Sequence, residues 1–454
     1  MNKKEIERKV LDRVVPTKEY REKLDKIILE IEEILKNEIS KRKMPITVEL
    51  VGSTAKDTYL KDNMDIDYFL LFPIDYTKEK IAENAISIGE TFLSKTEESY
   101  AEHPYLRGYY KDFYVEIVPC YEIKDATQKL SAVDRTPLHT KYVKENLKEK
   151  QKKEVLLFKQ FLKGIDCYGA ETQIEGFSGY LCEILIMHYG SFEKTIKKAS
   201  NWKPGEKLAL SKGKYPDFDT PLSFIDPVDS ERNVSSALSK EKFDLFIKAC
   251  KEYDKNPRIT FFFPNKVKPW PLQKINKKIK KQSCQYIGVE INKPNIIDEN
   301  LYPQIRKAAR SIQDAGKRYG FEIYDSTYHI GGAENTITLI IKASAYPLSD
   351  TFVHMGPPVT IKKNSDDFLK KYKNNPKVVK EPYVKNNRFY VELKREYTEI
   401  KDFLRKEVGN LSMGKHLDVI INKKYKIIEL EDMLTEDFQT FWTEYLDGKM
   451  PWER

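Results

Sequence analysis

The sequence contains no run of about 18 apolar residues, the length that a membrane-spanning helix needs. Residues 1–10 are charged and lack an apolar signal core, so we expect neither a membrane span nor secretion. Cysteine is scarce, with five in the chain, and no two have the CxxC spacing of a zinc site. We interpret them as reduced thiols and expect a cytoplasmic protein.

What the chain does have is length and charge. Its 454 residues suit several domains, and 40% hydrophobic with 33% charged residues is typical of a soluble globular protein. The net charge of +9 is a modest excess. It fits ordinary solubility as well as a polyanionic partner, so composition alone does not decide between them.

The first part of the chain alternates between helix and strand patterns. Apolar residues at helical spacing predict a long helix over 17–40 and a second helix over 84–95. Strand patterns follow at 46–51, 65–72 and 113–118, the last stopped by Pro119. This alternation predicts a small α/β domain.

The pattern changes near residue 150, where helical signals dominate, and strand signals return after residue 258. The fold class that we predict is a multidomain α+β protein with an α/β head, a helical central domain and an α+β body and tail. The corresponding boundaries are 1–150, 151–258 and 259–454.

The most informative segment for chemistry runs from Gly52-Ser53 to an Asp-Ile-Asp motif. Asp65 and Asp67 are two residues apart on a predicted strand, so both side chains leave the same face. Carboxylates held that close repel each other unless a cation neutralises them, and Mg²⁺ does so with oxygen ligands. The glycine permits close backbone approach, and a helix that begins there offers N–H groups to phosphates.

A third carboxylate, Glu116, lies between apolar residues on another predicted strand. A lone acid there is costly unless it is paired. Beside Asp65 and Asp67 it would complete a two-metal site, which activates a hydroxyl and stabilises the leaving oxygen in phosphoryl transfer. Each element alone is also typical of an exposed strand or an ordinary turn. Their order and spacing together resemble the nucleotidyltransferases of the DNA polymerase β-like superfamily.

Longer segments resemble one family within that superfamily, the archaeal-type, class I CCA-adding enzymes. The segments that carry this resemblance are VGSTAKDTYLKDNMDIDYFLLF (51–72), AEHPY (101–105), VEIVPCY (115–121), SAVDRTPLH (131–139), YGAE (168–171), GFSGYLCE (176–183), DPVDSERNV (226–234) and KPNIIDENLYPQ (293–304). They extend through most of the chain and are densest before residue 240.

The resemblance implies template-independent addition of C, C and A to the 3′ end of tRNA from CTP and ATP, including repair of incomplete ends. It implies a two-metal Mg²⁺ site at Asp65, Asp67 and Glu116. It also implies that the triphosphate is contacted by Ser53, Lys56, Lys159 and Tyr168. The nucleotide pocket would be lined by His103, Thr136 and His139. Lys56 stands where the family pattern has arginine, and Glu116 where some members have aspartate.

Arg232 would read the base edge of CTP or ATP, according to the same resemblance. An arginine is a fixed fork of donors, and cytosine and adenine offer a ring-nitrogen acceptor where uracil and guanine present a donor. From the residues alone, an arginine ion-paired with the nearby acids is the alternative interpretation, the acids being Asp226, Asp229 and Glu231.

Partners and alternatives follow from the same analysis. Basic stretches at 274–281 and 370–380 are typical of solvated faces, and their gathering in the last 200 residues favours a phosphate-binding surface. The resemblance implies that this region binds the tRNA acceptor stem by shape and that the protein is a homodimer.

A poly(A) polymerase or oligoadenylate synthetase-like enzyme is the alternative within the superfamily, and an inactive RNA-binding scaffold is the alternative outside it.

Overall fold

The computed structural model describes residues 2–61, 65–100, 103–332 and 335–454. The chain forms two compact units. The first unit comprises Met1–Lys266 and Lys449–Arg454, and the second comprises Val267–Gly448. Within the described residues, no helix is both long and apolar enough to cross a membrane.

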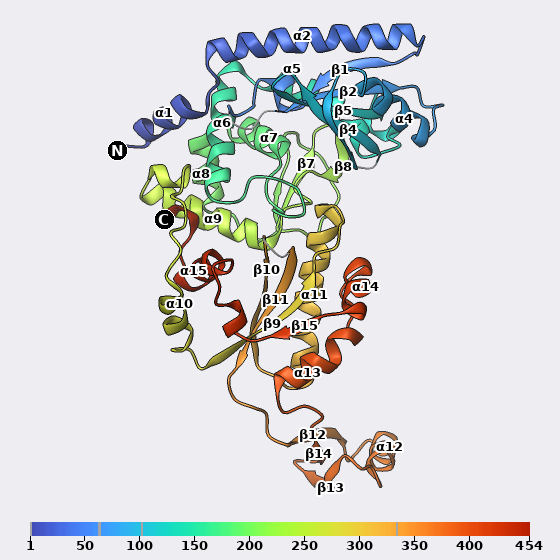
Figure 1. Ribbon diagram of the computed structural model, residues 1–454, viewed down its shortest axis with the longest axis vertical. Coiled ribbons are helices and arrows are strands. Elements are labelled where there is room, and N and C mark those ends of the chain that lie inside the picture. The colour runs from blue at the N-terminus through green and yellow to red at the C-terminus, as the bar shows by residue number, and fades with distance from the viewer. Residues whose placement is uncertain (1, 62–64, 101–102, 333–334) are drawn as a thin grey trace. The chain divides into compact units, whose positions relative to one another are not determined.

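A five-stranded sheet forms the head of the first unit, with the strand order β1-β2-β5-β4-β3 (Figure 1). The strands β2 and β5 run parallel, and the other neighbours are antiparallel. The strand bounds are Thr47–Val51 (β1), Ile66–Phe72 (β2), Ser94–Tyr100 (β3), Pro104–Tyr110 (β4) and Phe113–Tyr121 (β5). The expected α/β head is thus confirmed.

One face of this sheet is covered by two helices, α2 (Lys18–Lys41) and α4 (Lys78–Gly89) (Figure 1). Alternate residues of β2 point to opposite faces: Tyr68 and Leu70 pack beneath these helices, whereas Phe69 and Leu71 belong to a core on the other face. Asp67 has the strand parity of Phe69, so it lies on the face that α2 and α4 leave uncovered.

Two predicted boundaries in the head are wrong. The helix expected over 84–95 spans Lys78–Gly89, because Thr77 caps its N-terminus and the chain then turns into β3. Pro119 does not end its strand. It pairs with Leu70 of β2, while β4 pairs with β5 only as far as Ile117, so the missing N–H of Pro119 leaves no β4 partner unsatisfied.

The rest of the first unit is mainly helical, as expected for residues 151–258. Six of its helices share one large core, and their bounds are Lys3–Val14 (α1), Thr136–Asn146 (α5), Glu149–Gly164 (α6), Gly179–Tyr189 (α7), Phe192–Ala199 (α8) and Lys240–Lys255 (α9). A short helix, α3 (Gly52–Lys56), follows β1 directly. The sequence patterns missed a three-stranded sheet here, formed by β6 (Glu206–Leu208), β7 (Leu222–Asp226) and β8 (Asp229–Asn233).

The second unit contains two sheets. The larger has the order β10-β11-β9-β15 and packs α11, α13 and α14 on one face and α10 and α15 on the other. The bounds of these strands and helices are Leu272–Ile279 (α10), Cys284–Asn292 (β9), Asp298–Arg318 (α11), Ile323–Ile330 (β10), Thr336–Ser344 (β11), Ile400–Glu407 (α13), Lys415–Lys423 (α14), Lys426–Ile428 (β15) and Gln439–Asp447 (α15).

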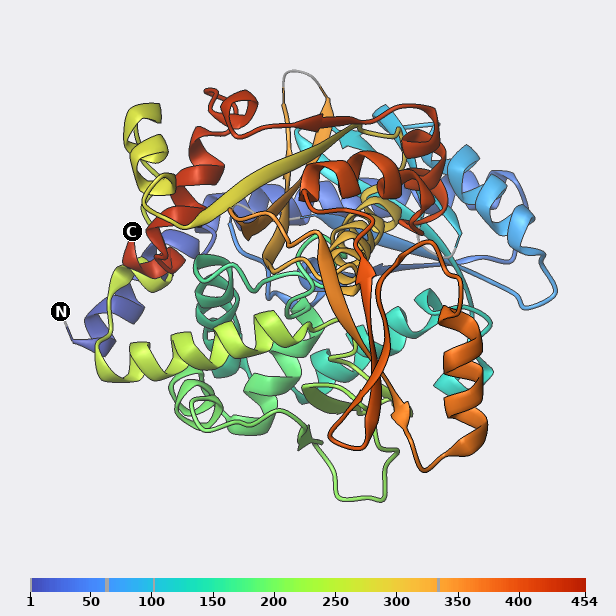
Figure 2. The same cartoon turned by 90° about the horizontal axis from the view of Figure 1, so that it is seen from below.

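The smaller sheet has the order β12-β14-β13 and is packed against α12, coloured orange in Figure 2. Its bounds are Thr351–Pro358 (β12), Lys362–Tyr372 (α12), Val378–Lys385 (β13) and Arg388–Lys394 (β14). Short 3₁₀ helices complete the described structure at Ala126–Gln128 (η1), Val133–Arg135 (η2), Ile259–Phe261 (η3), Val408–Asn410 (η4), Glu431–Met433 (η5) and Pro451–Glu453 (η6). The second unit thus contains two separate sheets, and the predicted domains, with boundaries at 150 and 258, stay predictions.

The last residues of the chain return to the core of the first unit. Trp452 is fully buried, stacks on Phe261 with ring centroids 5.3 Å apart, and donates its indole N–H to Glu252 at 2.6 Å. Trp452→Ala should therefore lower the free energy of unfolding by about 3–5 kcal/mol, as measured by denaturant unfolding. Ile74→Ala is the control, since Ile74 is 67% exposed, and it should change stability by less than about 0.5 kcal/mol. Equal effects of both changes would contradict this packing.

Candidate active site

The parallel pairing of β2 and β5 places two of the predicted carboxylates side by side. Asp67 lies directly opposite Glu116 in the register of these strands. Asp65 lies just before β2 rather than within it, and it is exposed. The hydroxyl of Thr54 donates to the backbone carbonyl of Asp65 at 2.6 Å, which fixes the chain where it enters the strand.

The carboxylates raise one another's affinity for protons. Burial, and then the charges of Glu116 and Asp65, raise the pKa of Asp67 to about 7. Burial and the charge of Asp65 raise the pKa of Glu116 to about 7, against the opposing effect of Arg107. Although Asp65 as a whole is exposed, its carboxyl group is partly shielded from water, and this desolvation also raises its pKa, again opposed by Arg107. A cation at this edge of the sheet would relieve the repulsion and keep all three ionised.

The donor types fit a hard divalent cation, because all three side chains offer carboxylate oxygens. As the side chains stand, no three acidic, histidine or cysteine groups among the described residues are gathered closely enough to enclose a metal ion. The fit therefore rests on charge, donor chemistry and the shared strand edge.

Gly52 is required at the turn between β1 and α3. Its φ of +71° lies in the left-handed region, and a methyl group at this position would collide with the Oδ2 atom of Asp67. The carboxylate of Asp67 thus rests directly on the backbone of Gly52. Ser53 follows as the next residue of α3 and is half-buried.

A buried ion network lies beside this turn, between α3, α6 and α7. The ammonium of Lys56 bonds Glu183 Oε2 at 2.7 Å, and that of Lys159 lies 3.6 Å from Glu183 Oε1. Lys159 also donates to the carbonyl of Thr58 at 2.8 Å, and the Thr58 hydroxyl donates to Glu183 at 2.6 Å. Although burial alone would raise it, the pKa of Glu183 is lowered by the two lysines and these hydrogen bonds. The carboxylate is therefore ionised.

The structure brings Tyr168 to the same place. A methyl group on Gly179, the first residue of α7, would lie 3.3 Å from the Tyr168 hydroxyl and 3.5 Å from the ammonium of Lys159. The predicted triphosphate residues Lys56, Lys159 and Tyr168 therefore surround the start of α7. A helix N-terminus adds backbone N–H groups that suit an anion.

A second cluster is centred on Asp226 at the end of β7. Its Oδ2 atom lies 2.8 Å from His139 Nε2 and accepts from Arg232 Nη1 at 2.8 Å, and its Oδ1 atom accepts from the Tyr180 hydroxyl at 3.1 Å. Burial opposes ionisation, yet the bonds from His139, the Val228 N–H and Arg232 lower the pKa of Asp226 to about 2. Burial lowers the pKa of His139.

The remaining predicted residues lie around these clusters. Thr136 is the first residue of α5, one helical turn before His139, and is half-buried. His103 is buried just before β4, where its ring meets Tyr121 edge-on at 6.3 Å. Its predicted role rests on the sequence resemblance alone.

Sequence reasoning assigned no role to Glu183 or Tyr180. It named Asp226 only as one of three acids that could pair with Arg232, and the structure confirms that ion pair. Glu183 carried a usable signal, because it is an acid between Cys182 and Ile184 in an apolar helix. The same argument had already singled out Glu116. No sequence pattern singled out Tyr180, because its hydroxyl donates to Asp226, which is 46 residues away in the chain.

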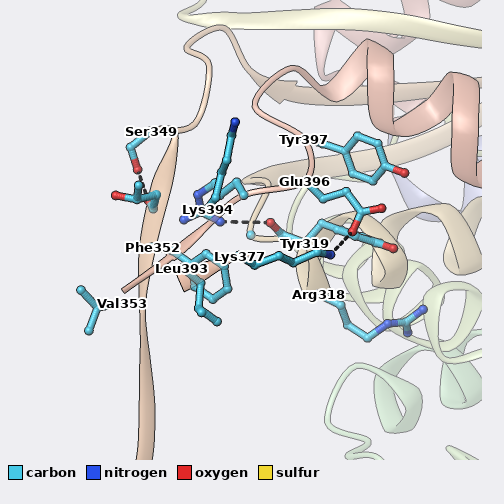
Figure 3. Close-up of a pocket in the computed structure, with 13 residues that line it drawn as sticks. Arg318, Tyr319, Ser349, Phe352, Val353, Lys377, Leu393, Lys394, Glu396 and Tyr397 are labelled. Carbon is cyan, nitrogen blue, oxygen red and sulfur yellow. Dashed lines mark hydrogen bonds and ion pairs between the residues drawn. The ribbon is translucent and has the colours of Figure 1, made fainter. Parts of the chain in front are cut away.

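A cavity of about 660 Å³ lies elsewhere, in the second unit (Figure 3). Basic and aromatic side chains line it, among them Arg318, Lys377, Lys394, Tyr319 and Phe352. Within it, Lys377 pairs with Glu396 at 3.1 Å, and Arg395 donates to the carbonyl of Tyr319 at 3.2 Å. It contains none of the residues predicted to bind nucleotide or metal.

Comparison with protein families matches three parts of the chain. A model described as "Nucleotidyltransferase domain" matches residues 30–139, which contain the three carboxylates. Models described as "tRNA nucleotidyltransferase, second domain" and "CCA-adding enzyme, C-terminal domain" match residues 153–263 and 283–429. The fold and these matches define the protein as a multidomain nucleotidyltransferase.

Full-length relatives narrow the class. The chain is 35% identical to the CCA-adding enzyme of Methanosarcina barkeri, over 94% of each chain. It is 34% identical to that of Archaeoglobus fulgidus, over 96% of this chain and 97% of the relative, and 36% identical to that of Methanocaldococcus jannaschii, over 94% and 95%. The chain belongs to the family of archaeal CCA-adding enzymes.

The contact between Gly52 and Asp67 makes a first prediction for this site. Gly52→Ala should lower the rate of nucleotide addition at least roughly 100-fold, because the new methyl group displaces the Asp67 carboxylate. Gly205→Ala is the matched control, since Gly205 also has a positive φ, +86°, but nothing lies within 4 Å of its added methyl group. Both variants should lose similar thermal stability, and only the first should lose activity. Full activity of Gly52→Ala would contradict this geometry.

The raised pKa of Asp67 makes a second prediction. In metal-free protein its pKa of about 7 exceeds the ordinary value of 3.8, so the folded state holds this proton more tightly than the unfolded chain does. Its contribution to stability is full at low pH and is lost as the pH rises through about 7. Asp67→Asn, which carries no charge, should therefore gain melting temperature over the wild type as the pH increases from about 5 to about 8.

A divalent cation should reverse that gain, because it stabilises the carboxylate form of the wild type and not the amide of the variant. Asp112→Asn serves as the control, since the Asp112 side chain is 84% exposed, and its melting temperature should follow that of the wild type across the range. A constant difference between Asp67→Asn and wild type at every pH would contradict the repulsion.

Proposed function

We propose that this protein adds C, C and A in turn to the 3′ end of tRNA, using CTP and ATP and no nucleic-acid template, and that it repairs incomplete ends. The observation that carries the proposal is the near full-length relationship to archaeal CCA-adding enzymes, with a carboxylate pair in register on β2 and β5. A poly(A) polymerase shares such a site, but the match of residues 283–429 to the "CCA-adding enzyme, C-terminal domain" supports CCA addition and not that alternative.

Asp65, Asp67 and Glu116 would hold the metal, which we propose is Mg²⁺ in a two-ion arrangement. Bound there, the ions would lower the pKa of the attacking 3′-hydroxyl and neutralise charge on the transferred phosphate. The protein's own contribution is to fix the carboxylates: Gly52 lets Asp67 lie against the backbone, and Thr54 holds the carbonyl of Asp65.

The triphosphate would bind at the start of α7, with contacts from Ser53, Lys56, Lys159 and Tyr168. An ammonium group has three N–H donors, so Lys56 can bond Glu183 and still offer donors to phosphate. Lys159 is 1% exposed and already bonds Thr58, so it would act mainly through its charge. Lysine in place of the family's arginine at position 56 keeps the charge and gives up two-pronged geometry.

The base would lie near Arg232, with His103, Thr136 and His139 lining the pocket. One guanidinium nitrogen of Arg232 is engaged by Asp226, and the side chain stays 29% exposed, so further N–H donors are available to a base. Cytosine and adenine place an acceptor nitrogen where uracil and guanine place an N–H donor. One fixed donor therefore favours the two correct nucleotides.

The RNA would be held by the second unit. The lysines of the segment 274–281 are exposed on and after α10, whose apolar side is buried through Ile275 and Ile279. Lysines of α12 and the basic side chains that line the cavity in Figure 3 are further positive groups of the second unit. Such surfaces bind the phosphates of an RNA helix such as the acceptor stem without reading its sequence. Action as a cytoplasmic homodimer is part of the same proposal.

An extension assay tests this function. A tRNA transcript that ends before CCA is incubated with the protein, Mg²⁺ and each nucleotide singly and together. Two additions from CTP, followed by one from ATP, are the expected result. Long tails from ATP alone would indicate a poly(A) polymerase, and tight tRNA binding without extension would indicate a scaffold.

Asp67→Ala should abolish this extension while leaving tRNA affinity within about twofold, because the metal site and the phosphate-binding surface use different residues. Binding is measured by electrophoretic mobility shift on the same transcript. Full extension by Asp67→Ala would overturn the assignment of the metal site, whatever nucleotide the enzyme prefers.

A further inference from the structure

The hairpin that carries Arg232 is held by a buried aspartate at each end of its turn. Asp226 ends β7 and Asp229 begins β8, and their side chains are 0% and 8% exposed. Their partners come from the segment 129–139 near the head: Lys129 at 2.8 Å and Arg135 at 3.0 Å for Asp229, and His139 at 2.8 Å for Asp226. Both acids therefore attach the hairpin to the segment 129–139 through buried ion pairs.

Only one of them also contacts the proposed nucleotide pocket. The Oδ2 atom of Asp226 accepts from Arg232 Nη1 and lies at the same distance, 2.8 Å, from His139 Nε2. Its Oδ1 atom accepts from the hydroxyl of Tyr180, whose ring stacks on His139 with centroids 4.1 Å apart. One carboxylate thus joins side chains from α5, α7 and β8.

This arrangement constrains the guanidinium. A long arginine side chain that is part-exposed would otherwise adopt many rotamers, and each would point its donors in a different direction. An ionised acceptor on one nitrogen fixes the plane of the fork, so the remaining donors point in a set direction. A base-reading donor needs such a fixed direction, because selection depends on where the acceptor lies.

We propose that Asp226 is a positioning residue for nucleotide selection, which holds Arg232 and His139 in one arrangement through its two carboxylate oxygens. This inference rests on the proposed function, in which Arg232 reads the base. Asp226 itself need not touch the nucleotide. Its effect on selection passes through Arg232.

The test compares Asp226→Asn with Asp229→Asn, a matched change at the other end of the same turn. The asparagine at 226 keeps the shape but carries no charge, and it has one acceptor oxygen where the carboxylate has two. It therefore cannot accept from Arg232 and His139 on one side and from Tyr180 on the other. The ratio of kcat/KM for CTP over UTP is measured on a transcript that ends before CCA, and for ATP over GTP on one that ends in CC. Thermal melting of each variant is recorded alongside.

Asp226→Asn should lower both ratios roughly 10- to 100-fold, as expected for losing a hydrogen bond to a charged group. Asp229→Asn should lower the melting temperature to a similar extent and leave both ratios unchanged. In the Arg232→Ala background, adding Asp226→Asn should produce no further fall, because the two residues act as one unit.

Two results would overturn the inference: unchanged ratios in Asp226→Asn, or an equal fall in Asp229→Asn. Either can occur while Arg232→Ala loses selection, in which case the proposed base reader stands and only the role of Asp226 fails. If Arg232→Ala keeps full selection, the base-reading assignment itself fails. If the wild type adds no C or A, the proposed function fails.

Tyr180→Phe keeps the test decisive if Asp226→Asn does not fold. It removes one donor to Oδ1 of Asp226 and preserves the ring that stacks on His139. Both ratios should fall roughly 2- to 10-fold, less than in Asp226→Asn because the carboxylate keeps its bonds to Arg232 and His139, and only when Arg232 is present. An equal fall in the Arg232→Ala background would show that Tyr180 acts independently of Asp226 and Arg232, which contradicts the proposal.

Discussion

The parallel pairing of β2 with β5 is the constraint from which the rest of the first unit follows. It sets Asp67 opposite Glu116 and so places like charges together in a partly buried position. Such an arrangement is unfavourable in the protein alone. It persists because Tyr68 and Leu70 on β2, and Ile117 on β5, anchor both strands in the core beneath α2 and α4. Stability from one face of the sheet thus supports a repulsive, functional arrangement on the other.

The helical region is attached to the head through buried acids rather than through apolar packing alone. Glu183 on α7 binds Lys56 of α3, and Asp226 at the end of β7 binds His139 of α5. A buried charge that loses its partner is costly, so each contact constrains the geometry strongly. Because the partners are themselves residues of the proposed nucleotide site, the contacts that join the two regions also shape that site.

Sequence patterns predicted the strands that carry Asp67 and Glu116, because strand periodicity marks the first and apolar neighbours isolate the second. Asp65, expected on the same strand as Asp67, lies just before it. They missed β8, a five-residue strand of mostly polar residues, because it shows no apolar alternation. They also missed the bond from Lys56 to Glu183, which are 127 residues apart, because no local pattern pairs residues at such a distance. Family resemblance named Lys56 and Arg232. The structure adds Glu183 as the partner of Lys56 and shows that Asp226, one of three acids near Arg232 in the sequence, is its partner.

The two buried acids leave different charges at the two ends of the proposed nucleotide site. Glu183 is shared by Lys56 and Lys159, so these three side chains together carry one net positive charge, which suits a phosphate. At the other end, Asp226 balances Arg232, and burial lowers the pKa of His139, which favours its neutral form. A neutral base gains little from net charge and much from a correctly directed donor. In the proposed function, the charge distribution would therefore orient the nucleotide, while the hydrogen-bond geometry around Arg232 would select its base.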